Sequence, residues 1–263
     1  MKQRIITAVV ALLILMVVLF VVPGVVAQAV IVAVVLGGAW EWSALLGGSG
    51  LVSRIVYVSI VGGLLAAVTL SPLDSGLVLQ AAMAWWLAAL VWIFYYPTPI
   101  PTAVRWLGGV AVLVPFYVAL VLLYKTGPAV LLFALLIVWV ADCGAFFAGK
   151  TLGRVKLAPS ISPGKTWEGV VGGLAAVALL ALGHSHWFGS DLKTMVPFCL
   201  AIACLSIIGD LTVSIFKRNA GLKDSGRLFP GHGGVLDRID SLAAGAPLFA
   251  LGIGWGIGWA GLQ

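Results

Sequence analysis

Long apolar runs, broken by short polar stretches or by glycine and proline, follow one another along the whole chain. A helix needs about 20 mostly apolar residues to cross the hydrocarbon core of a bilayer. Hydrophobic residues make up 62% of this chain and charged residues only 9%, whereas a soluble domain carries about 25% charged residues. The chain therefore lacks the polar residues that a water-facing surface requires, and we expect an integral membrane protein.

Nine of the runs are candidate transmembrane helices, because in lipid only helices and closed barrels satisfy their backbone hydrogen bonds. We expect an all-α, polytopic bundle of about nine transmembrane helices. Residues 1–130 would hold the first five, and residues 131–263 would form a catalytic membrane region with two charged loops, within one integral membrane unit. The candidate spans are Ile5–Val22, Val25–Leu46, Ile55–Leu70, Leu77–Phe94, Val104–Tyr124, Pro128–Lys150, Gly169–Gly183, Met195–Lys217 and Leu242–Leu262.

The basic residues divide unequally between the two sides that nine spans create. Of the 15 lysines and arginines, only Lys125 and Lys193 fall on one side, and the other thirteen fall on the side of the N-terminus. Cytosolic loops of membrane proteins carry an excess of lysine and arginine. We therefore expect a bacterial-type inner-membrane protein with a cytosolic N-terminus and both charged loops in the cytosol. The net charge of +6 then needs no nucleic-acid partner.

Two acidic residues, Asp142 and Asp210, lie inside candidate spans at matching depth. At about 1.5 Å per residue, each is roughly 10–12 Å inward from the basic end of its helix. Acids inside membrane helices are costly and usually functional. Two carboxylates at one depth favour a shared Mg²⁺, and the alternative is an interhelical hydrogen bond or ion pair. We expect the two helices to be neighbours and both aspartates to face one pocket.

The loop after the eighth candidate span is the most densely charged segment. Its glycines near position 233 let backbone amides approach phosphate oxygens closely. Asp237 and Asp240, three residues apart at the start of the next helix, share one helix face. Carboxylates beside a basic, glycine-rich segment are typical of metal-assisted phosphoryl or nucleotidyl transfer. The basic residues are Lys217, Arg218, Lys223, Arg227 and Arg238, and Asp224 and His232 lie between them.

The loop after the sixth candidate span contains Gly164-Lys165-Thr166, which also ends a phosphate-binding P-loop. That motif needs a glycine at the position of Pro159 and a preceding strand, and we expect neither here. Lys165 remains a candidate phosphate ligand. Glu168 would begin the next helix, where the helix dipole favours a negative charge.

The charged segment closely resembles the phosphatidate cytidylyltransferase (CDP-diacylglycerol synthase) family. The family's pattern of Ser, Lys-Arg, Lys-Asp, Pro-x-His-Gly-Gly and Asp-Arg-x-Asp stands complete from Ser214 to Asp240. The segment Ser162–Gly169 and the surroundings of Asp142 also resemble the family. Detailed resemblance covers roughly residues 139–241, whereas the first 130 residues resemble the family mainly in being hydrophobic, with the pair Glu41-Trp42.

The resemblance implies transfer of CMP from CTP to phosphatidic acid, with Mg²⁺ as cofactor. It also suggests a homodimer and leaves a second cation open. With it, we assign catalytic roles to Lys217, Arg218, Lys223, Asp224, His232 and Arg238. We expect the substrate to be bound by Ser162, Lys165, Ser214, Arg227, Gly233 and Gly234. The metal ligands would be Asp142, Asp210, Asp237 and Asp240.

The sequence leaves two other classes of membrane protein open. A polyprenol kinase or an archaeal-type lipid cytidylyltransferase would use a similar pocket on another lipid. An ion-coupled transporter would instead spread its acids along a transmembrane path, whereas here they cluster beside the basic residues. The sequence leaves the role of Glu41 open and places His184 and His186 in an exposed outer loop.

Overall fold

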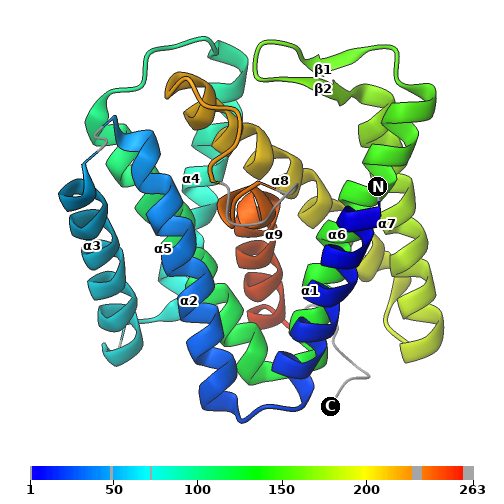
Figure 1. Ribbon diagram of the computed structural model, residues 1–263. Coiled ribbons are helices and arrows are strands. Elements are labelled where there is room, and N and C mark those ends of the chain that lie inside the picture. Colours follow the sequence, from blue (N-terminus) through cyan, green and yellow to red (C-terminus); the bar gives the residue numbers. More distant parts are fainter. Residues whose placement is uncertain (1, 48–49, 72, 227–232, 257–263) are drawn as a thin grey trace.

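The protein is an almost entirely helical bundle with one small β-hairpin (Figure 1). The computed structural model describes residues 2–47, 50–71, 73–226 and 233–256, with side chains from residue 9 onward. The first half comprises α1 (Lys2–Phe20), α2 (Gly24–Trp42) with the 3-10 turn Ser43–Leu46, α3 (Leu51–Leu70), α4 (Ser75–Tyr95) and α5 (Thr102–Thr126). The second comprises α6 (Pro128–Leu152), β1 (Lys156–Ala158), β2 (Ser162–Thr166), α7 (Trp167–Phe188), α8 (Leu192–Asn219) and α9 (Leu236–Gly254).

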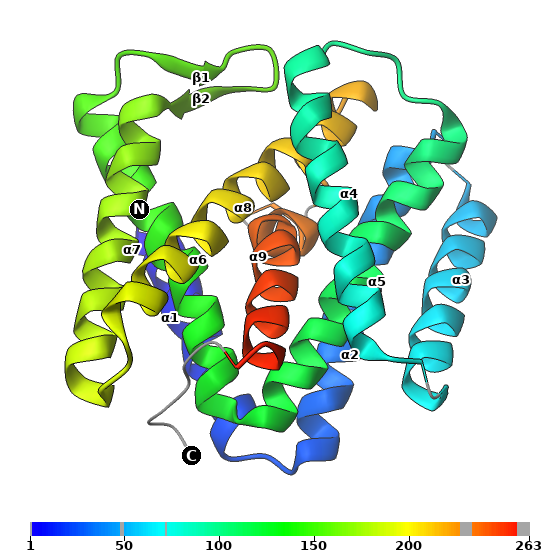
Figure 2. The same ribbon diagram turned by 180° about the vertical axis from the view of Figure 1, so that it is seen from behind.

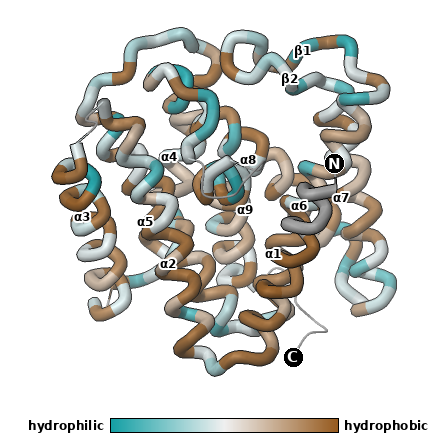
Figure 3. The backbone as a smooth tube through the Cα atoms, viewed as in Figure 1, coloured by the Kyte–Doolittle hydropathy of each residue, from teal (hydrophilic) through white to brown (hydrophobic). Residues whose placement is uncertain are grey.

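Within the described residues, seven helices, α2 to α8, are long and apolar enough to cross a membrane. The protein is therefore a multi-pass membrane protein, as the apolar runs predict. α1 contributes a shorter apolar stretch, Val9–Phe20, and the ninth predicted span extends to Leu262, beyond the described residues. Hydropathy colouring places hydrophobic backbone along α1 and α2 and hydrophilic segments at the hairpin (Figure 3).

The end of the bundle that carries the hairpin gathers the predicted charged loops. The C-terminal ends of α4, α6 and α8 and the N-terminal ends of α5 and α7 lie there together (Figures 1 and 2). The predicted loop after α6 is instead an antiparallel hairpin, in which Lys156 pairs with Thr166 and Ala158 with Ser162. A strand therefore does precede Lys165. It belongs to a two-stranded hairpin, so the P-loop architecture of a buried strand leading into a helix is still not met.

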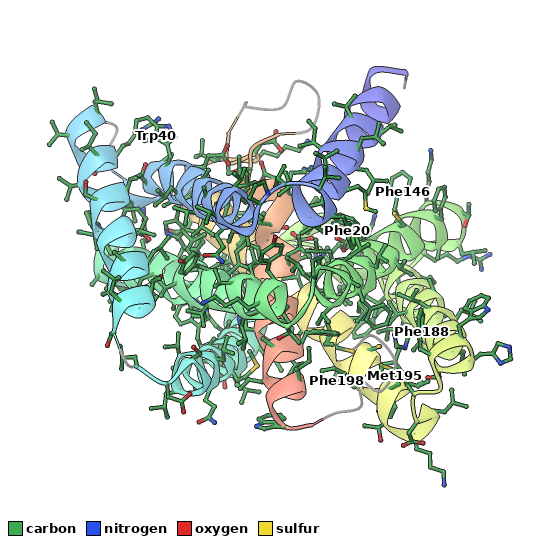
Figure 4. All side chains as sticks on the ribbon, turned by 90° about the horizontal axis from the view of Figure 1, so that it is seen from below. Phe20, Trp40, Phe146, Phe188, Met195 and Phe198 are labelled. Atoms are coloured by element: carbon green, nitrogen blue, oxygen red, sulfur yellow. The ribbon has the colours of Figure 1, made fainter. Side chains whose placement is uncertain are left out.

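Helix α9 forms the centre of the bundle. It contacts α2, α4, α5, α6 and α8, and its N-terminus begins in the interior of the molecule (Figure 2). Viewed from below, side chains fill the space around this helix, and Phe198 of α8 lies beside it (Figure 4). The residues that open α9, Asp237 and Asp240, are thereby held inside the bundle.

Small residues allow α6 and α7 to pack backbone against backbone. A side chain on Gly172 of α7 would collide with Ala148 of α6, and one on Gly144 would come within 2.9 Å of the Gly172 carbonyl oxygen. Close approach through small residues is a common way for helices to associate in membranes. This tight pair forms one wall of the cavity described below.

The expectation that His184 and His186 lie in an exposed outer loop is wrong. α7 continues through both to Phe188, because Gly189, with φ of +68°, provides the helix C-cap only there. His184 is buried, with its ring against Phe133 and Phe188 and its Nδ1 3.4 Å from Ser190 Oγ. His186 is exposed on the same helix.

Candidate active site

A cavity of about 620 Å³ opens between the hairpin and helices α6 to α9. Among the described residues, five carboxylates and four cationic side chains line it, together with small and apolar residues of α6, α7 and α8 and with Gly164, Thr166 and Ser241. The charged lining residues are Asp142, Lys150, Lys165, Asp210, Lys217, Asp224, Asp237, Arg238 and Asp240. Such a concave site, part apolar and part highly charged, suits an amphipathic ligand with anionic groups.

Lys165 connects the hairpin to α8 across the cavity. Its Nζ lies 2.6 Å from Oδ2 of Asp210, and the other oxygen of Asp210 accepts a hydrogen bond of 3.2 Å from Ser214 Oγ. Both side chains of the ion pair retain 26% of their exposure, so they remain open to the cavity. Thr166, the next residue, caps α7 by accepting a hydrogen bond from the Gly169 amide, which fixes the hairpin on the helix.

A second, more buried ion pair lies at the start of α9. Lys217 Nζ is 2.8 Å from Oδ1 of Asp237 and 3.7 Å from Oδ2 of Asp240, and all three side chains are less than a tenth exposed. Oδ2 of Asp237 accepts hydrogen bonds of 2.9 Å from the amides of Ser225 and Gly234. Asp237 therefore organises the backbone on both sides of the segment 227–232.

Asp142 lines the same cavity from α6, opposite α8, as predicted from its depth. The structure confirms that α6 and α8 are neighbours and that Asp142 and Asp210 face one pocket.

The hard oxygens of Asp142, Asp210 and Asp240 are suitable for Mg²⁺, which commonly uses one or two carboxylates together with substrate phosphates. Within the described part of the chain, no three acidic, histidine or cysteine side chains converge closely enough to form a metal site alone.

Only some of the other predicted residues line the cavity. Asp224 and Arg238 line the cavity, whereas the guanidinium of Arg218 donates to the carbonyl oxygens of Ile161 and Leu222 and so ties α8 to the hairpin. Lys223 is exposed.

Three of the residues predicted to bind substrate lie outside the cavity lining. Ser162 is half-buried in β2, and Ser214 donates a hydrogen bond to Asp210. Gly233 adopts a φ of +78°, which favours glycine. Arg227 and His232 lie outside the described residues.

Two contributions from the first half of the chain went unpredicted. Glu41, at the end of α2, accepts hydrogen bonds from Ser225 Oγ at 2.7 Å and from the amides of Val235 and Leu236 at 3.0 and 2.8 Å. Arg105 of α5 donates to Oδ1 of Asn219, the last residue of α8, at 2.6 Å. A glutamate within an apolar run indicates a buried partner, but nothing in the sequence identifies that partner.

The fold and the cavity together define a polytopic membrane protein with a site for phosphate-bearing, amphipathic ligands. The chain belongs to the cytidylyltransferase family, whose model matches residues 2–254. It is 44% identical to a phosphatidate cytidylyltransferase of Pseudomonas aeruginosa over 98% of both chains. It is 34% identical to one of Haemophilus influenzae, over 95% of this chain and 97% of that relative, and 46% identical to one of Brucella suis over 48% and 47%.

Proposed function

We propose that this chain transfers the CMP unit of CTP to phosphatidic acid, giving CDP-diacylglycerol and pyrophosphate. The observation that carries the proposal is the cavity in which the Lys165–Asp210 and Lys217–Asp237 pairs lie beside an apolar wall. Family membership over residues 2–254 points to the same reaction. The apolar wall, which includes Leu174 and Ile207, would receive the lipid while its phosphate meets the charged residues.

In the reaction, an oxygen of the phosphatidate phosphate attacks the α-phosphorus of CTP. A new P–O bond forms there, and the bond to the β-phosphate oxygen breaks, so that pyrophosphate leaves. A phosphate monoester is already anionic at pH 7, so the attacking group needs no strong general base. Lys165, Lys217 and Arg238 would hold the phosphates and orient the α-phosphorus for this displacement.

We also propose that Mg²⁺ accompanies CTP, held by Asp210 with Asp142 or Asp240. When bound, the ion would offset negative charge on the triphosphate. A homodimer, suggested by the family resemblance, completes the proposal and is tested by the mass of the detergent-solubilised protein.

The proposal further places the N-terminus and the cavity mouth on the cytosolic side. The distribution of basic residues supports this orientation, because positively charged segments stay in the cytosol. CTP would then reach the hairpin end of the bundle directly. The lipid would arrive from the bilayer, on the apolar side of the cavity.

The experiment that tests the assignment of the site uses Asp237→Asn in purified protein supplied with phosphatidate, CTP and Mg²⁺. We expect CDP-diacylglycerol formation to fall at least a hundredfold, because the carboxylate that pairs with Lys217 and orders the adjacent backbone is lost. Asp191→Asn, at the opposite end of α8, should retain activity within twofold. Near-normal turnover of Asp237→Asn would remove this residue, and the buried ion pair, from the active site.

A further inference from the structure

Glu41 is a buried carboxylate that accepts hydrogen bonds from the backbone beside the active site but does not line the cavity. It is 7% exposed and comes from α2, in the first half of the chain. Among the described residues, its three hydrogen-bond donors all belong to the charged segment, and Ser225 lies 184 positions after it in the sequence. A buried carboxylate is costly unless it is well paired, so this arrangement indicates a specific role.

Glu41 caps helix α9 from outside that helix. The first amides of a helix have no partner within it, and usually a neighbouring side chain accepts from them. Val235, at the N-cap position of α9, has no side chain that can do so. The two carboxylate oxygens of Glu41 instead accept from Val235 N and Leu236 N, where a negative charge also favours the helix dipole.

The donors of the charged segment are shared between Glu41 and Asp237. The Gly234 amide donates to Asp237, and the next two amides donate to Glu41. Ser225 joins both, since its amide donates to Asp237 and its hydroxyl to Glu41. Glu41 thus fixes the same two backbone stretches that hold Asp237 against Lys217.

The backbone also fits closely around the Glu41 carboxylate. A Cβ atom on either Gly226 or Gly234 would collide with its carboxylate oxygens. Glycine at these positions lets the two stretches close directly on Glu41. An amide side chain could not replace the carboxylate, because glutamine offers one acceptor oxygen and would direct its NH₂ group at a donor.

We propose that Glu41 is a positioning residue for cytidylyl transfer, which holds Asp237 and the backbone of residues 234–236 in the arrangement that the CTP site requires. The inference rests on the proposed function of the cavity. It assigns the first half of the chain a direct part in shaping the active site, through a residue that touches no substrate.

The test compares Glu41→Gln with the wild type, as purified protein in phosphatidate-containing detergent micelles with Mg²⁺. The kcat and KM for CTP are measured per folded protein. We expect the KM for CTP to rise at least fivefold and kcat to fall at least tenfold. Glu168→Gln is the matched control, because it makes the same change at the start of α7, where the carboxylate accepts from the Val155 amide. Its KM for CTP should stay within twofold.

Ser225→Ala provides a milder second variant that keeps the carboxylate and removes one of its donors. We expect its KM for CTP to rise two- to fivefold. The double variant with Glu41→Gln should be no worse than Glu41→Gln alone within twofold, because both changes break one network. If Glu41→Gln does not accumulate, an unchanged KM for CTP in Ser225→Ala overturns the inference.

Two further outcomes would overturn it. Wild-type kinetics in Glu41→Gln would show that the carboxylate is dispensable. A lower yield of folded Glu41→Gln protein with unchanged kcat and KM would make Glu41 a stability residue only. If Asp237→Asn abolishes turnover in the same assay while Glu41→Gln does not alter it, the inference about Glu41 fails and the proposed function stands.

Discussion

Lys165 on the hairpin and Asp210 on α8 form an ion pair across the cavity, with 2.6 Å between Nζ and Oδ2. Each residue comes from a different predicted loop or span, and 45 positions (210 − 165) separate them. The pair places the Lys165 ammonium group, which can bind a phosphate, next to the Asp210 carboxylate, which can bind a metal ion. The hairpin therefore belongs to the active site, although it lies outside the helical core.

Removal of this cation should impair catalysis without disturbing the bundle. We predict that Lys165→Met lowers kcat/KM for CTP at least tenfold, which corresponds to about 1.4 kcal/mol of transition-state stabilisation. Lys156→Met, on the exposed face of the same hairpin, is the control and should stay within twofold. Steady-state kinetics on both purified variants tests this prediction. An equal fall in kcat/KM in both variants would show that the loss comes from disruption of the hairpin.

The positions of membrane helices and the clustering of charge could be predicted from sequence, because span length and basic-residue bias are local properties. The shared pocket of Asp142 and Asp210 could be predicted for the same reason, since depth along a helix follows from residue count. The class of protein followed from a contiguous motif, Ser214–Asp240. Residues 227–232, which include Pro230 and His232 of this motif, lie outside the described residues.

Contacts between distant segments could not be predicted. Glu41 meets Val235 and Leu236 only because α9 lies at the centre of the bundle, against α2. The hairpin was missed because Ser162–Thr166 has no alternation of apolar and polar residues and contains Pro163. His184 was misplaced because the helix continues to a glycine cap beyond the apolar run.

Asp142 offers a test of the proposed magnesium ligands. We predict that Asp142→Ala reduces activity at least tenfold and that a higher Mg²⁺ concentration restores part of it, because a weakened cation site fills at higher concentration. Asp191→Asn, assayed over the same Mg²⁺ range, should follow the wild-type curve. A loss of activity that does not change with Mg²⁺ would assign Asp142 to substrate positioning instead.

The close packing of α6 and α7 predicts a stability effect. Gly172→Val should lower the free energy of unfolding by about 1–3 kcal/mol, because its side chain overpacks the contact with Ala148. Gly63→Val on α3 is the control, since a Cβ there meets no atom within 4 Å. Thermal melts in detergent should separate the two variants, and equal midpoints would show that α6 and α7 tolerate a wider spacing.

The proposed orientation predicts which end of the bundle a membrane-impermeant thiol reagent reaches in intact cells. Ser160 is exposed in the hairpin turn, and Thr126 is exposed at the opposite end of α5. In a variant without Cys143, Cys199 and Cys204, we predict that Thr126→Cys is labelled at once and Ser160→Cys only after permeabilisation. The reverse pattern would place the cavity mouth outside the cytosol.

The central claim is the transfer of a nucleotide, and it is tested most directly by following the phosphates of CTP. Purified protein is incubated with phosphatidate, Mg²⁺ and CTP labelled in separate reactions at the α- or the γ-phosphate. The account predicts that the α-label appears in a lipid that co-migrates with CDP-diacylglycerol, while the γ-label is released as pyrophosphate. Transfer of the γ-label to lipid, or no labelled lipid with either substrate, would contradict it.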